Sequence, residues 1–207
     1  MLHHTLYNVA YSIITNSILQ GFMLENGLKE EKVLLYLAVV QAIQIFIMLG
    51  FSPIVDKLKK TMSIYAYSIL LQTTMFGAVI FICLYSDLSQ TLKTVILFSA
   101  GILTNIYQAI YNILSLKTPY YYLDMNKIGN IQGKTGALCS LVGACISGLI
   151  VFFTSKFDYN KTMLVFFSIG TFFIIISFLI IKQIRSHPPV SSVKTTNTKK
   201  INIFKYK

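Results

Sequence analysis

Six long windows without Asp, Glu, Lys or Arg dominate the pattern of hydrophobic and polar positions along the chain. Each window contains 20 to 26 residues, and short clusters of charged residues separate it from the next. About 20 apolar residues of α-helix span the hydrocarbon core of a bilayer, which is roughly 30 Å thick. The sequence therefore predicts an all-α membrane protein with six transmembrane helices. The windows are 1–24, 33–55, 61–86, 94–116, 135–155 and 162–181.

The amino-acid composition agrees with burial in lipid. Hydrophobic residues make up 55% of the chain and charged residues 12%, whereas a soluble domain carries about 25% charged residues. The windows are continuously apolar instead of alternating, which disfavours membrane strands. A helix also satisfies its own backbone hydrogen bonds where no water is present. We expect residues 1–185 to form one transmembrane domain in contact with the lipid bilayer.

The basic residues predict the orientation, because cytoplasmic loops of membrane proteins are enriched in Lys and Arg. If both termini are cytoplasmic, 13 of the 18 Lys and Arg residues lie inside and 5 lie outside. The formal net charge of +11 then belongs to the cytoplasmic face, so we expect no nucleic-acid partner. Residues 186–207 contain two adjacent prolines and no acid, which predicts a basic, disordered cytoplasmic tail.

The same reasoning predicts the cellular location. We expect a multi-pass protein of the cell membrane with cytoplasmic N- and C-termini. The abundance of Ile, Lys, Asn, Tyr and Phe favours an AT-rich genome, and hence a bacterial source.

Catalytic chemistry is not expected. The six windows contain no Asp, Glu, Lys or Arg, and the three histidines lie near the two ends of the chain. A hydrolase or a proton relay inside the membrane needs a titratable group at depth. The three cysteines lie within apolar windows at spacings that fit no metal motif. We therefore expect no enzyme, no metal site and no cofactor.

Two windows carry amide side chains at helical spacing. Asn16 and Gln20 lie on one face of the first window, and Asn105, Gln108 and Asn112 lie on one face of the fourth. Lipid is a poor environment for amides, so these faces should meet other helices or a wet cavity. Both alternatives remain open: the amides bond helices together, or they line a cavity for a small-molecule substrate.

The fifth window carries small residues at every fourth position. Gly136, Ser140, Ala144 and Gly148 form one stripe along the expected helix. A stripe of this kind lets another helix approach closely in a membrane. We therefore expect these four residues to take part in helix packing.

A short polar hinge, Ser52 to Lys60, separates the second and third windows. Pro53 lacks a backbone donor and disfavours continued helix, so the second segment should end or kink there. The longest internal loop is expected at residues 117–134, where two glycines, a proline and three consecutive tyrosines occur.

The hinge resembles the loop between helices 2 and 3 of the major facilitator superfamily, with the pattern G-x-x-x-D-R-x-G-R-[KR]. Asp56 matches the aspartate of that pattern, and Lys57 and Lys60 stand where it has arginine. Ser52 and Lys59 replace its two glycines. The run Asn105-Ile106-Tyr107-Gln108-Ala109 is similar to the R-x-x-Q-G motif of helix 4, with Asn105 in place of the arginine.

The resemblance covers the whole chain but half of the family's fold, since members usually have two six-helix halves, each with a 3+3 inverted repeat. It implies that helices 1 and 4 line the substrate cavity. Helices 2 and 5 would face the other half, helices 3 and 6 would be peripheral, and residues 186–207 would begin the linker between halves. Asn16, Gln20, Asn105, Gln108 and Asn112 are then the cavity candidates.

The implied function is transport of a small solute by alternating access, performed by the N-terminal half of a split or truncated transporter. Asp56, Lys57 and Lys60 would form a cytoplasmic latch, although topology determination explains the two lysines equally well. The partner would be a second six-helix half or a second copy of the chain. The alternatives are a non-transporting membrane scaffold or accessory subunit, and a homodimeric half-size transporter.

Overall fold

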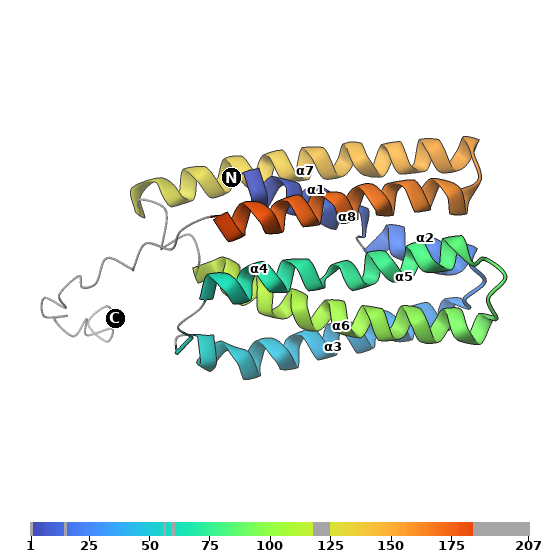
Figure 1. Ribbon diagram of the computed structural model, residues 1–207, viewed down its shortest axis with the longest axis horizontal. Coiled ribbons are helices and arrows are strands. Elements are labelled where there is room, and N and C mark those ends of the chain that lie inside the picture. The colour runs from blue at the N-terminus through green and yellow to red at the C-terminus, as the bar shows by residue number, and fades with distance from the viewer. Residues whose placement is uncertain (1, 15, 56, 59–60, 118–124, 184–207) are drawn as a thin grey trace, which may run out of the picture.

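A computed structural model describes the chain except residues 1, 15, 56, 59–60, 118–124 and 184–207, and it also leaves undescribed the side chains of residues 16, 117 and 125–128. The described residues form α-helices and no strand, which confirms the all-α class. Figure 1 shows these helices running along one common direction. The helices are α1 (Leu2–Ile13), α2 (Asn16–Glu25), α3 (Glu30–Val55), α4 (Thr61–Leu71), α5 (Thr73–Leu84), α6 (Gln90–Lys117), α7 (Met125–Lys156) and α8 (Tyr159–Gln183).

Five helical spans are long and apolar enough to cross a membrane, so the structure agrees with a membrane protein. Four of them are α3, α6, α7 and α8, and α4 continues into α5 as the fifth. The first expected segment differs, because it is divided into α1 and α2, of 12 and 10 residues. The backbone N–H of Ile14 donates to the Tyr11 carbonyl three residues back, at 3.0 Å. This tighter turn ends α1.

The second segment ends close to the expected position. Pro53 lies in the last turn of α3, which ends at Val55, two residues later. Glu30 and Glu31 begin the helix, where the positive end of its dipole favours acidic side chains.

The prediction of a loop at residues 117–134 is wrong for its second part. α7 begins at Met125 and continues through Gly129 and Gly133 to Lys156. A glycine inside a helix costs only about 1 kcal/mol relative to alanine, so two glycines do not prevent a 32-residue helix. The three tyrosines of that loop lie outside the described residues.

The helices pack in a specific pattern. α1 contacts α8 and α7, while α6 contacts α3, α4 and α5. α8 also packs along α4 and α5 in the centre of the bundle. In Figure 1, α7 and α3 lie at opposite edges. The interior is therefore formed mainly by α1, α4, α5, α6 and α8.

Two glycines allow the closest helix contacts. A Cβ atom at Gly170 of α8 would collide with the ring of Phe76 of α5, and one at Gly101 of α6 would collide with the ring of Tyr36 of α3. Both aromatic rings lie in the buried core. Each glycine thus provides the space that a large side chain of the neighbouring helix fills.

Candidate functional site

The hydroxyl of Tyr7 lies between two buried amides in the interior of the bundle. It is 2.7 Å from Oε1 of Gln72 and 2.6 Å from Oε1 of Gln108. The side chain of Gln108 continues this chain, because its Nε2 donates to Oδ1 of Asn112 at 3.0 Å. Tyr7 comes from α1, Gln72 from the junction of α4 and α5, and the other two from α6. We call these four residues the amide–tyrosine chain.

All members of this chain except Asn112 are buried. Tyr7, Gln72 and Gln108 are 1%, 2% and 7% exposed. None of the four carries a charge, so the site holds polar groups without the larger cost of a buried ion. Hydrogen bonding between its members offsets the loss of water around each amide.

One amide nitrogen of the amide–tyrosine chain is unpaired. Nε2 of Gln72 is buried and has no hydrogen-bond partner among the residues that the structure describes. A buried polar atom without a partner costs about 1–3 kcal/mol. Such atoms are rare in native proteins, and their presence calls for a functional or structural explanation.

Aromatic rings surround the Tyr7 end of the site. The ring of Tyr111 lies 4.2 Å from that of Tyr7, and it stacks on Tyr65 at 5.2 Å. The Tyr111 hydroxyl lies 3.2 Å from Nδ1 of His4. A neutral imidazole accepts at Nδ1, so the Tyr111 hydroxyl donates to it when Nε2 carries the ring proton.

The structure brings only part of the predicted cavity set together. Gln108 and Asn112 belong to the amide–tyrosine chain, whereas Nδ2 of Asn105 donates to the Gly101 carbonyl of its own helix at 2.9 Å. Gln20 is half-buried on α2. The side chain of Asn16 lies outside the described residues.

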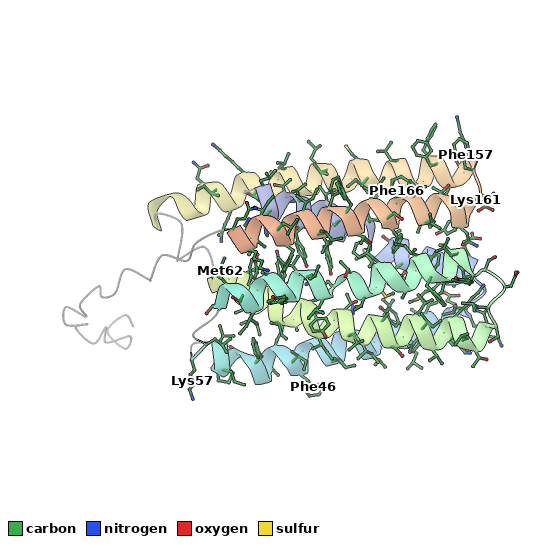
Figure 2. All side chains as sticks on the ribbon, viewed as in Figure 1. Phe46, Lys57, Met62, Phe157, Lys161 and Phe166 are labelled. Atoms are coloured by element: carbon green, nitrogen blue, oxygen red, sulfur yellow. The ribbon has the colours of Figure 1, made fainter. Side chains whose placement is uncertain are left out.

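The latch residues are mostly outside the described part of the chain. Asp56 and Lys60 belong to the undescribed hinge, so the latch stays a prediction. Lys57 is exposed at one end of the bundle, and Lys161 lies at the opposite end, as Figure 2 shows.

The small-residue stripe of the fifth segment faces outward. Gly136, Ser140, Ala144 and Gly148 are all exposed on α7. A Cβ atom at Gly136 or Gly148 would have no described atom within 4 Å outside its own helix. The stripe therefore packs against no described helix of this chain, and its packing role stays a prediction that concerns a partner.

Sequence reasoning missed Tyr7 and Gln72. Tyr7 looks like one apolar aromatic among many, and its hydroxyl becomes informative only when the amides of other helices face it. Gln72 offered a signal, because it is a lone glutamine in the middle of an apolar window. An amide at that depth needs a polar partner.

Comparison with known proteins finds no matching family model, no matching curated protein and no matching solved structure. Fold and site together define a helical bundle with five spans long and apolar enough to cross a membrane and with an uncharged polar site in its interior.

Proposed function

We propose that this chain is a six-segment half of a transporter of the major facilitator type, which moves a small uncharged solute by alternating access. The amide–tyrosine chain carries the proposal, because it places polar side chains of the first and fourth segments together inside the bundle. These are the two segments that the family resemblance assigns to the substrate cavity.

The strongest helix contacts support a 3+3 inverted repeat, whereas the weaker contact of α7 with α8 has no comparable counterpart between α3 and α4 or α5 among the described residues. The six segments are α1 with α2, α3, α4 with α5, α6, α7 and α8. A 3+3 repeat relates segment 1 to 4, 2 to 5 and 3 to 6. It therefore relates the contact of α1 with α8 to that of α6 with α4 and α5. The same repeat relates the contact of α3 with α6 to that of α7 with α1. The contact of α8 with α4 and α5 maps onto itself. Inverted repeats of this kind are typical of secondary transporters.

The outer helices support the need for a second half. α3 and α7 form the edges of the bundle, and both present long exposed faces. Figure 2 shows Phe46 pointing away from α3, and its side chain is 73% exposed. In the proposed transporter, a second half or a second copy covers these faces.

The proposal is tested by solute uptake into proteoliposomes. Vesicles that contain the chain are mixed with an excess of mannitol, glucose or myo-inositol, and light scattering follows their swelling. Potassium gluconate is the charged comparison, since the uncharged site should exclude an anion. We expect swelling faster than in empty vesicles for at least one neutral solute.

Two variants and one control make the test specific. Gln108→Ala and Asn112→Ala each remove a member of the amide–tyrosine chain, so both should slow uptake while membrane insertion stays unchanged. Gln183→Ala is the matched control, because Gln183 is exposed at the end of α8, away from the proposed site, and should leave uptake unchanged. Swelling no faster than in empty vesicles, or equal swelling with all variants, would contradict transport by this chain.

A further inference from the structure

Tyr7 has a single hydroxyl proton but faces two amide oxygens. It donates to one of them and must accept from the other amide, so one of the two glutamines presents its amine to Tyr7. A half turn of a glutamine about its terminal bond exchanges its oxygen and nitrogen with little change in shape. The amide–tyrosine chain therefore has two hydrogen-bond directions that fit the same heavy-atom positions.

In the first direction, the Tyr7 hydroxyl donates to Gln108, and Gln72 donates its amine to Tyr7. The carbonyl oxygen of Gln72 then faces away from the chain and needs a donor. In the second direction, the hydroxyl donates to Oε1 of Gln72, and Gln108 turns so that its amine donates to Tyr7. Asn112 then turns its own amine toward the oxygen of Gln108, which replaces the bond seen in the structure. The amine of Gln72 then faces away and needs an acceptor, which is the unpaired Nε2 described above.

A group that pairs with the outer atom of Gln72 in both directions must both donate and accept. A neutral hydroxyl does so, whereas an ammonium group only donates and a carboxylate only accepts. The amide–tyrosine chain also contains no charged residue that would offset the burial of an ion. The chemistry of the site thus favours an uncharged group that pairs in both directions, such as a hydroxyl.

We propose that the Gln72 carboxamide binds a hydroxyl group of the transported solute, which makes Gln72 a specificity-determining contact for neutral hydroxylated solutes. This inference rests on the proposed function, because a solute reaches a side chain that is 2% exposed only if the bundle opens. It adds a contact from the third segment, which the family resemblance places at the periphery of the half.

The position of Gln72 suits such an opening. α4 ends at Leu71 and α5 begins at Thr73, so Gln72 lies at an interruption of the third segment. Its backbone N–H donates to the Ile69 carbonyl three residues back, at 3.2 Å. Interruptions of this kind in the middle of a helix often mark functional hinges.

The test is equilibrium binding of tritiated mannitol, glucose and glycerol to the purified full chain in detergent, measured by scintillation proximity. Gln72→Met keeps the length and apolar body of the side chain, and the Tyr7 hydroxyl keeps Gln108 as its acceptor. We expect at least one probe to bind wild type and Gln72→Met to raise its Kd by about 2- to 10-fold, the effect of one neutral hydrogen bond. Unlabelled gluconate should compete poorly.

Gln183→Met is the matched control, since the same substitution falls on an exposed residue at the end of α8. It should leave the Kd unchanged. Gln72→Asn, which retains the amide on a shorter side chain, should bind better than Gln72→Met if the amide itself is recognised. It also serves as the second variant if Gln72→Met fails to fold.

Three outcomes would overturn the inference. The first is equal binding by wild type and both Gln72 variants. The second is binding of gluconate in preference to the neutral probes. The third is the absence of binding by any probe, in which case water supplies the O–H group beside Gln72. Binding that depends on Gln72 without any vesicle uptake would support the inference and contradict transport instead, so the two failures are distinguishable.

Discussion

Replacing Tyr7 by phenylalanine tests the amide–tyrosine chain most directly. The change removes one oxygen atom from a side chain that is 1% exposed and keeps the ring in contact with Tyr111. It leaves one carbonyl oxygen and one amide nitrogen, one from Gln72 and one from Gln108, without their shared partner. A buried polar group without a partner costs about 1–3 kcal/mol. We expect a loss of stability of about this size.

Tyr11→Phe is the matched control for this prediction. Tyr11 lies one turn later on α1, and its ring stacks on that of Tyr7 at 5.9 Å, but it is only partly buried. The same deletion of a hydroxyl should therefore cost less than about 1 kcal/mol. The chain contains no tryptophan, so thermal unfolding in detergent is best followed by circular dichroism at the helical band.

For a protein of this size, about 1 kcal/mol corresponds to a change in Tm of roughly 2 to 4 °C. Tyr7→Phe should lower Tm by roughly 3 to 10 °C, and Tyr11→Phe by much less. The double variant Tyr7→Phe with Gln72→Met should recover part of the loss, since only one of the two unpaired groups is then left. Equal Tm values for wild type and Tyr7→Phe would refute the buried hydrogen-bond chain.

The remaining predictions concern packing, a turn and topology. Gly170→Ala should lower the free energy of unfolding by about 1–3 kcal/mol, because the added Cβ collides with Phe76. Gly148→Ala has open space around it and should be neutral or stabilising by up to about 1 kcal/mol. Similar Tm values for the two variants would contradict the contact between α5 and α8. Gly27→Ala should lower the free energy of unfolding by about 1–2 kcal/mol, because Gly27 has a φ of +81°. The same thermal assay measures this loss, with Gly77→Ala as the control. In intact cells, a membrane-impermeant maleimide should label Lys161→Cys and not Lys57→Cys, and the reverse pattern would invert the proposed orientation.

Much of the architecture follows from the sequence because lipid imposes a simple rule. Charge-free windows of at least 20 residues predicted helices at almost all the observed places, including the end of α3 near Pro53. The division of the first segment at Ile14 was missed, because hydropathy averaged over a window does not register a local change in backbone hydrogen bonding. The early start of α7 was also missed, because polar residues and two glycines suggest a loop but permit a helix outside the membrane core.

The candidate site was predictable only in part. Amide spacing predicted that Gln108 and Asn112 share one face of the fourth segment, and their side chains are hydrogen-bonded. Their role in a substrate cavity stays a prediction. The same spacing included Asn105, whose side chain bonds back to its own helix, because a helical face spans more than the few positions that meet a given neighbour. Tyr7 and Gln72 could not be joined from the sequence, since 65 residues separate them and only the packing of α1 against the α4–α5 junction relates them.

The two interrupted segments supply the two residues that the sequence missed. Tyr7 stands on α1, which ends at Ile13, and Gln72 stands between α4 and α5. The other two members of the chain lie on α6, which runs for 28 residues without interruption. If short helices move against the long α6 during transport, the hydrogen bonds of Tyr7 are among those that change. Reversing the hydrogen-bond direction of the amide–tyrosine chain keeps the number of its internal hydrogen bonds constant. The reversal would therefore cost little free energy. A buried ion pair in the same place would have to be separated, at a cost of several kcal/mol.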